Sequence, residues 1–200
     1  VPRFNFKPRY DKPPFITWCQ ALSFRTFGEN DFAARFPSAF FFVLTTAIIF
    51  IFARRWFENP VPLWSALVFA TCLHALLLSR AATADMALTF FYTVSAAAAW
   101  EILSVRSRGA ALMLWRVLFY AGLSLGFLAK GPVAFLPILG ALIFAVMQKI
   151  DRPLRVFWAW PGIFLTVFFI GCWAVPALLK TQGDYAAVGL GRHVFGRSVG

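Results

Sequence analysis

The sequence predicts an all-α fold, a polytopic transmembrane helical bundle, and three observations carry this prediction. Apolar residues make up 60% of the 200 residues and charged residues only 14%, whereas soluble domains average roughly 45–50% apolar and 25% charged residues. The chain holds 25 Phe and 8 Trp, more aromatic surface than a soluble domain of this size can bury. The apolar residues also gather into six long stretches. Lipid is therefore the expected solvent for most of the chain.

Residues 1–31 are predicted to form an outer-face segment beside the bilayer. Residues 1–14 are basic and contain four prolines, which exclude a long helix there. Residues 15–27 carry apolar side chains at helical spacing, with two prolines before them and Gly28 after them, the usual signals for a helix start and end. Thirteen residues are too few to cross a bilayer. We therefore expect an N-terminal interfacial helix.

Residues 32–179 are predicted to contain about six spans. Each stretch approaches the roughly 20 residues that a helix needs to cross a hydrocarbon core. The stretches cover residues 36–53, 62–79, 86–104, 112–129, 131–148 and 158–179. Residues 180–200 are interpreted as the start of an outer-face loop, so that residues 1–200 form part of a single transmembrane domain.

The loops between the spans predict the orientation. Alternate loops carry eight Lys and Arg residues, whereas the other short loops carry only Arg80 and Lys130. Positive charge favours the cytoplasmic side, so the eight-residue set is assigned there. Six of the eight Trp residues lie near the same span ends, as expected for an interfacial belt.

The outer face carries an unusual basic cluster under this orientation. Nine basic residues fall in the two end segments: Arg3, Lys7, Arg9, Lys12, Arg25, Arg35, Lys180, Arg192 and Arg197. Positive charge on the translocated side opposes the usual bias, and such local exceptions often mark functional sites. Together with the net charge of +11, the cluster indicates an anionic lipid phosphate rather than nucleic acid.

Asp11 and Lys12 lie on a proline-fixed turn, Tyr10–Pro14, and give two interpretations. The turn is either a solvated entry to the interfacial helix or a preorganised site. In the second case Lys12 contacts a phosphate, and Asp11 contacts a metal ion or a hydroxyl group.

Asp85 and Lys130 stand at span ends on the same predicted face. Asp85 is either a helix N-cap or a carboxylate held at the membrane surface. Lys130 either extends toward the interface as a snorkelling side chain or, held by the tight Gly131-Pro132 break, contacts a phosphate. Near the C-terminus, Arg197 follows His193 by four residues, which places both on one face of a short helix or in a flexible loop.

The sequence contains no Walker, GxGxxG, GxSxG or HExxH motif, so no nucleotide-binding, hydrolase or zinc-protease chemistry is indicated. Chemistry outside the membrane needs an activated substrate delivered there. A lipid-linked phosphate meets that need.

Four runs give the sequence a family resemblance. They are YDKPP, FGENDFAARFPSA, RAATADMALTFF and GFLAKGPVAFLP, which begin at Tyr10, Phe27, Arg80 and Gly126. In this order they resemble the integral-membrane glycosyltransferases that use polyprenyl-phosphate sugars, the class C superfamily. The similarity is nearest to the branch of protein mannosyltransferases and lipid A aminoarabinose transferases, and it covers nearly the whole chain.

The resemblance implies roles for five residues. Lys12, Lys130 and Arg197 are expected to contact the donor phosphate, and Asp85 is expected to be a supporting active-site carboxylate. Asp11 matches an acidic position associated with a metal, so a divalent cation is an open cofactor, with none certain. The main catalytic base is expected upstream of Val1, on a part of a longer protein, so that this piece alone should be inactive.

The implied function is transfer of a sugar from a polyprenyl-phosphate donor to an acceptor, which is lipid A, another glycan or a protein. The expected location is the bacterial inner membrane, with a periplasmic active site. The other partners are membrane lipids, and no nucleic acid is expected. The alternative is a membrane transporter or lipid flippase, which needs polar groups near the midplane of its spans. A structural membrane subunit accounts for the hydrophobicity but leaves the basic cluster unexplained.

Overall fold

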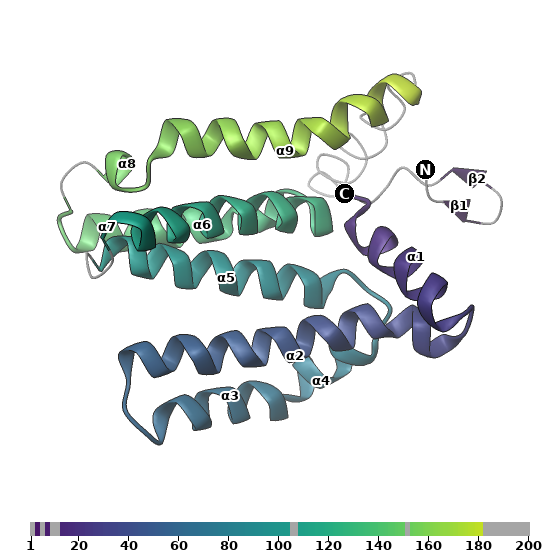
Figure 1. Cartoon of the computed structure of the whole chain (residues 1–200), viewed down its shortest axis with the longest axis horizontal. Coiled ribbons are helices and arrows are strands. Elements are labelled where there is room, and N and C mark those ends of the chain that lie inside the picture. Colours follow the sequence, from purple (N-terminus) through teal and green to yellow (C-terminus); the bar gives the residue numbers. More distant parts are fainter. Residues whose placement is uncertain (1–2, 5–6, 9–12, 105–107, 151–152, 182–200) are drawn as a thin grey trace, which may run out of the picture.

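The computed structural model describes residues 3–4, 7–8, 13–104, 108–150 and 153–181, which form a helical bundle (Figure 1). Four long helices run beside one another: α2 (Asp31–Trp56), α5 (Asp85–Leu103), α6 (Gly109–Lys130) and α9 (Ala159–Lys180). Each is long and apolar enough to cross a membrane. The predicted fold class, a polytopic helical bundle, is confirmed.

The N-terminal helix lies at an angle across one end of this bundle (Figure 1). Helix α1 spans Phe15–Phe27, the predicted range. It begins as Trp18 N donates to the Pro14 carbonyl over 3.0 Å, and it ends at Gly28, whose φ of 77° suits a residue without a Cβ. A two-residue antiparallel ladder, β1 (Arg3–Phe4) with β2 (Lys7–Pro8), precedes it and was not predicted.

Helix α2 begins five residues before the predicted apolar stretch at residue 36. The reason is a cap: the Asn30 side chain accepts a hydrogen bond from Ala33 N over 2.8 Å. This bond satisfies one of the amide donors that the first turn leaves without a helical partner. The cap extends the helix through a polar turn that hydropathy alone does not assign.

Two of the six predicted spans differ in the structure. The stretch 62–79 forms two helices, α3 (Val61–Thr71) and α4 (Leu73–Arg80), which bend by 58° at Cys72. The stretch 131–148 forms a 3-10 turn, η1 (Pro132–Phe135), and a shorter helix, α7 (Leu136–Met147). The described residues thus contain four spanning candidates, or five with the bent pair counted as one, rather than six.

Two buried apolar clusters hold the bundle together at different heights. One cluster joins α5, α6 and α7 through buried side chains that include Ile102, Leu123 and Ala145, and Phe157, which follows the short helix α8 (Pro153–Val156), completes it. The other joins α2, α5 and α6 through Phe41, Phe91 and Ala129. Much of the remaining apolar surface is exposed, as lipid-facing helices require.

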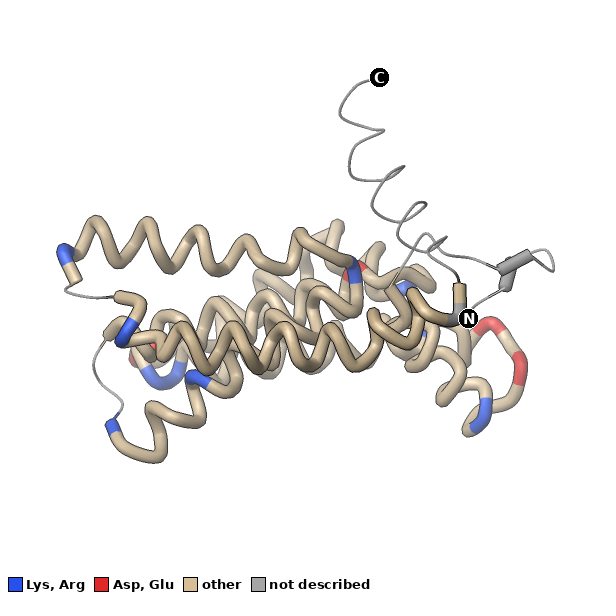
Figure 2. Tube along the Cα trace, turned by 90° about the horizontal axis from the view of Figure 1, so that it is seen from above, with Lys and Arg blue, Asp and Glu red and all other residues tan. Residues whose placement is uncertain are grey.

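Charged side chains lie near the two ends of the described helices, and the middle of the bundle is almost free of them (Figure 2). One end holds the C-termini of α2 and α5, the N-terminus of α6, and α8 (Figure 1). We call it the Arg55 end, after a residue in the last turn of α2. The opposite end, named the Asp85 end, holds the first residue of α5, the last residue of α6, and α1.

Candidate active site

An ion pair joins two neighbouring helices at the Asp85 end. Lys130 Nζ donates a hydrogen bond to Asp85 Oδ1, although the two residues are 45 positions apart in the chain. The Lys130 side chain is 47% exposed and the Asp85 side chain 28%. The pair therefore remains accessible to a substrate.

Both charges stand at the helix ends that favour them. Asp85 is the first residue of α5, where the helix dipole stabilises an anion, and Lys130 is the last residue of α6, where it stabilises a cation. An ion pair this exposed contributes only about 0–1 kcal/mol to folding. The pair therefore contributes little to the stability of the fold, whereas the ammonium group of Lys130 is well placed for an anionic ligand.

The Gly131 backbone fixes the position of Lys130. Gly131 has φ 83° and ψ −151°, a region that is essentially restricted to glycine. Its amide donates to the Phe127 carbonyl over 2.7 Å, which closes α6 directly after Lys130. The tight break predicted from Gly131-Pro132 is confirmed.

A loop contact fixes the approach to Asp85. Ser38 Oγ, on α2, donates to the Thr83 carbonyl over 3.1 Å, and Ser38 is buried. Asp85 itself is not the N-cap that one interpretation proposed. That place belongs to Ala84, which makes no side-chain cap bond. The carboxylate is instead directed to Lys130, because α6 ends beside the start of α5.

Helix α1 packs over the same end through aromatic side chains. The Phe15 ring lies 5.1 Å from the Phe91 ring and 5.9 Å from the Phe41 ring, measured between centroids. The first residue of α1 is thereby anchored to both α2 and α5. Residues 9–12, which precede Pro13 in the sequence, include two of the predicted site residues.

The structure brings together two of the five predicted site residues, Asp85 and Lys130. Asp11, Lys12 and Arg197 lie outside the described residues. Within the described residues, no group of three or more His, Cys, Asp and Glu side chains could hold a metal ion. The metal role of Asp11 therefore stays a prediction.

Sequence reasoning missed a second polar cluster, at the Arg55 end. Glu101 is fully buried, and its Oε1 accepts hydrogen bonds from Arg55 Nε over 2.7 Å and from Trp56 Nε1 over 3.1 Å. The Arg55 guanidinium also lies over the Trp115 ring, 5.6 Å from its centroid. The only signal in the sequence was a lone acidic residue within an apolar stretch.

Comparisons with known proteins place the chain in a family. Residues 11–175 match the family described as dolichyl-phosphate-mannose-protein mannosyltransferase. The chain is 30% identical over 186 residues to an undecaprenyl phosphate-alpha-4-amino-4-deoxy-L-arabinose arabinosyl transferase of Pseudomonas fluorescens, covering 92% of this chain and 33% of the relative. It is 35% identical over 155 residues to the enzyme of the same name from Pseudomonas aeruginosa strain LESB58, covering 76% of this chain and 28% of the relative.

Solved structures share the fold. ArnT from Cupriavidus metallidurans in the apo state superposes with a TM-score of 0.86 at 21% identity, covering 93% of this chain and 35% of that chain. The same protein bound to undecaprenyl phosphate superposes with a TM-score of 0.84 at 22% identity, covering 90% of this chain and 34% of that chain.

The chain thus spans about a third of the length of these relatives. The family match, in contrast, covers most of the chain, and it agrees with the order of the four motifs and with the helical membrane fold. The protein belongs to the dolichyl-phosphate-mannose-protein mannosyltransferase family of membrane glycosyltransferases.

Proposed function

We propose that this chain is part of an enzyme that transfers a sugar from a polyprenyl-phosphate donor to an acceptor, with the Asp85–Lys130 pair in the active site. Residues 1–200 form part of the transmembrane domain of that enzyme. The observation that carries the proposal is the accessible ion pair at the ends of α5 and α6. Family membership supplies the reaction class, and the Pseudomonas relatives are named for an undecaprenyl-phosphate donor.

Lys130 has the chemistry to stabilise the leaving group. The acceptor oxygen attacks the anomeric carbon of the sugar, the bond from that carbon to the phosphate oxygen breaks, and the electron pair leaves with the phosphate. The acceptor proton passes to a base outside the described residues. Negative charge builds on the departing oxygen, and a positioned ammonium group stabilises it most in the transition state.

Asp85 has the chemistry to position Lys130 before the donor binds. A carboxylate holds the ammonium group in the empty site, and an incoming phosphate competes for it. Asp85 then orients a hydroxyl or amine of the sugar or of the acceptor. This exchange of anionic partners needs an ion pair that is accessible and weakly stabilising, as this one is.

Lys12, Arg197 and Asp11 complete the proposed site. Lys12 precedes Phe15, the residue that anchors α1, by three positions in the sequence. A fully extended residue spans only about 3.3–3.6 Å, so the chain between the two residues is short. We assign donor-phosphate contacts to Lys12 and Arg197, and a divalent metal to Asp11. The support for these three roles is the match of their motifs to the family.

The protein is proposed to act at the periplasmic face of a bacterial inner membrane. The support is the charge of the loops, because basic residues of the predicted cytoplasmic set, including Arg54, Arg108 and Arg155, lie at the end opposite Asp85. A transporter is not favoured, because the described charges gather near the helix ends and leave the middle of the bundle apolar (Figure 2).

The test is transfer of radiolabelled sugar from a polyprenyl phosphate by membranes that contain the full-length protein. Lys130→Ala should lower the rate roughly hundredfold, the usual effect of removing one transition-state donor, and Lys130→Arg should retain more of it. Arg80→Ala removes an exposed cation near the same end and should leave the rate unchanged. Full activity of Lys130→Ala, at equal protein level, would refute the proposed role.

A further inference from the structure

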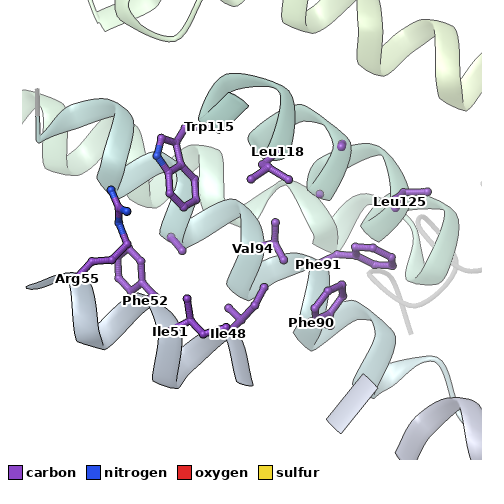
Figure 3. Close-up of a pocket in the computed structure, with 13 residues that line it drawn as sticks. Ile48, Ile51, Phe52, Arg55, Phe90, Phe91, Val94, Trp115, Leu118 and Leu125 are labelled. Atoms are coloured by element: carbon purple, nitrogen blue, oxygen red, sulfur yellow. The ribbon is translucent and has the colours of Figure 1, made fainter. Parts of the chain in front are cut away.

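A cavity of about 410 Å³ lies between α2, α5 and α6 (Figure 3), and neither Asp85 nor Lys130 lines it. Its walls are almost entirely apolar and include Phe52, Val94, Leu118 and Leu125. The lining residues of α6 run from Trp115 to Leu125, which corresponds to about 15 Å along a helix. The cavity is therefore elongated along the bundle and suits an aliphatic chain.

One charged side chain lines the cavity. Arg55 lies at the end of the cavity beside Trp115, and Phe90 and Phe91 lie at the other end (Figure 3). Arg55 Nε donates to Glu101 Oε1 over 2.7 Å and Arg55 Nη2 donates to Glu101 Oε2 over 3.4 Å, while the side chain as a whole stays 44% exposed. A guanidinium has five N–H donors and binds phosphate in a fork geometry. An apolar channel with an accessible, fixed cation at one end matches an amphiphile with an anionic head.

The position of the charge at one end of the cavity indicates which way the amphiphile lies in it. We expect its head at the Arg55 end, because the opposite end is lined by the uncharged rings of Phe90 and Phe91. Further exposed cations stand at the Arg55 end, among them Arg54, Arg108 and Arg155. This end carries the predicted cytoplasmic loops, and the cytoplasmic leaflet presents anionic lipid heads that attract such clusters.

We propose that this cavity binds one acyl chain of an anionic phospholipid, whose phosphate is held by Arg55 at the membrane surface opposite the Asp85–Lys130 pair. The buried Glu101 carboxylate acts as a positioning residue, because it fixes the guanidinium at the cavity entrance. The site is separate from the proposed donor site. The inference depends on the Arg55 geometry and the cavity, and not on the transfer reaction.

The experiment uses native mass spectrometry of the full-length protein, stripped of lipid in detergent and then titrated with phosphatidylglycerol or with phosphatidylcholine of identical chains. The unaltered protein should bind one phosphatidylglycerol at least tenfold more tightly than phosphatidylcholine. Ala121→Phe fills the cavity without touching the Arg55–Glu101 pair, and it should abolish this tight binding. Arg55→Lys keeps the charge but loses the fork geometry, and it should lower the preference for phosphatidylglycerol.

The matched control is Arg80→Ala, since Arg80 is an exposed cation near the Asp85 end and does not line the cavity. It should bind phosphatidylglycerol as the unaltered protein does. A thermal unfolding curve for each variant verifies that it is folded, and Arg55→Ala is avoided because it removes a cation that is paired with the buried Glu101 carboxylate.

Four results would overturn the proposal. The first is equal affinity for the two phospholipids, and the second is unchanged phosphatidylglycerol binding in folded Ala121→Phe. The third is that no tight phospholipid site is found, whereas polyprenyl phosphate binds to the unaltered protein and not to Ala121→Phe. That result would assign the cavity to the tail of the donor. If the full-length protein binds neither lipid here, another segment of the protein occupies the cavity, and the proposal is equally wrong.

Discussion

Lys130 and Asp85 form an ion pair that joins the C-terminus of α6 to the N-terminus of α5, across 45 positions of sequence. The pair lies at the Asp85 end of the bundle, the same end at which α1 lies (Figure 1). Each of its two charges is also stabilised by the dipole of its own helix. The contribution of the pair to folding can therefore be measured separately from its proposed role in catalysis.

A double-mutant cycle with Asp85→Asn and Lys130→Gln should show this separation. The coupling energy in unfolding should stay below about 1 kcal/mol, because both side chains are partly exposed. Transfer by the full-length protein should fall far more, and non-additively, since Asp85 is proposed to position the ammonium group of Lys130. Unfolding in detergent and transfer rates are measured on the same four proteins. A coupling of several kcal/mol in unfolding would instead make the pair a structural element.

Arg55→Ala should be among the most destabilising substitutions in the chain. Glu101 is completely buried, and removal of the partner of a buried charge costs about 3–5 kcal/mol. The neighbouring Arg54 is exposed, so that Arg54→Ala should change the free energy of unfolding by no more than about 0.5 kcal/mol. Denaturation in detergent compares the two variants. Equal stability would show that Glu101 finds other partners.

Three glycines in the helices should respond to alanine in opposite directions. A Cβ at Gly162 would stand 1.9 Å from Tyr120 Cε2, and a Cβ at Gly122 would stand 2.3 Å from Ser95 Oγ. Such overpacking typically costs about 1–3 kcal/mol. Gly140, in α7, has no atom within 4 Å of the Cβ position, so Gly140→Ala should stabilise by up to about 1 kcal/mol through helix propensity. Melting temperatures of the three variants provide the measurement.

Cys19 should react slowly with maleimide at neutral pH. Burial raises the pKa of the Cys19 thiol above its usual value, and its own backbone lowers it by less. Because the thiolate is the nucleophile, labelling of a Cys72→Ser, Cys172→Ser protein should accelerate until the pH passes the raised pKa. The same protein, once denatured, should label with the pH profile of an ordinary thiol. Coincident profiles for the folded and denatured protein would show that the packing of α1 against the bundle does not shield the Cys19 thiol.

Local signals in the sequence predicted much of the fold because they act over a few residues. The limits of α1 follow from two prolines and Gly28, and the break after Lys130 follows from Gly131-Pro132. The bend at Cys72 was missed, since Leu73–Arg80 continues the apolar run and only the backbone of Cys72, at φ −61° and ψ 120°, departs from a helix. Hydropathy reports where lipid can surround a chain and is insensitive to the direction of the helix axis.

The candidate site was predictable in part for the same reason. Asp85 and Lys130 stand at helix ends beside turn signals, so that each could be identified individually, but their pairing depends on the packing of α5 against α6. The contacts of Glu101 with Arg55 and Trp56 depend on pairs 45 and 46 positions apart. No local pattern encodes such contacts, and an acidic residue near the end of an apolar stretch resembles an ordinary interfacial charge.

The Ser38–Thr83 hydrogen bond has a mechanical consequence. It fastens the loop that carries Asp85 to α2, and the Phe15–Phe41 contact fastens α1 to the same helix. Helix α1 therefore contacts both helices that hold the surroundings of Asp85, α2 through Phe41 and α5 through Phe91. We expect a tilt of this surface helix to change the distance between the carboxylate of Asp85 and the ammonium group of Lys130.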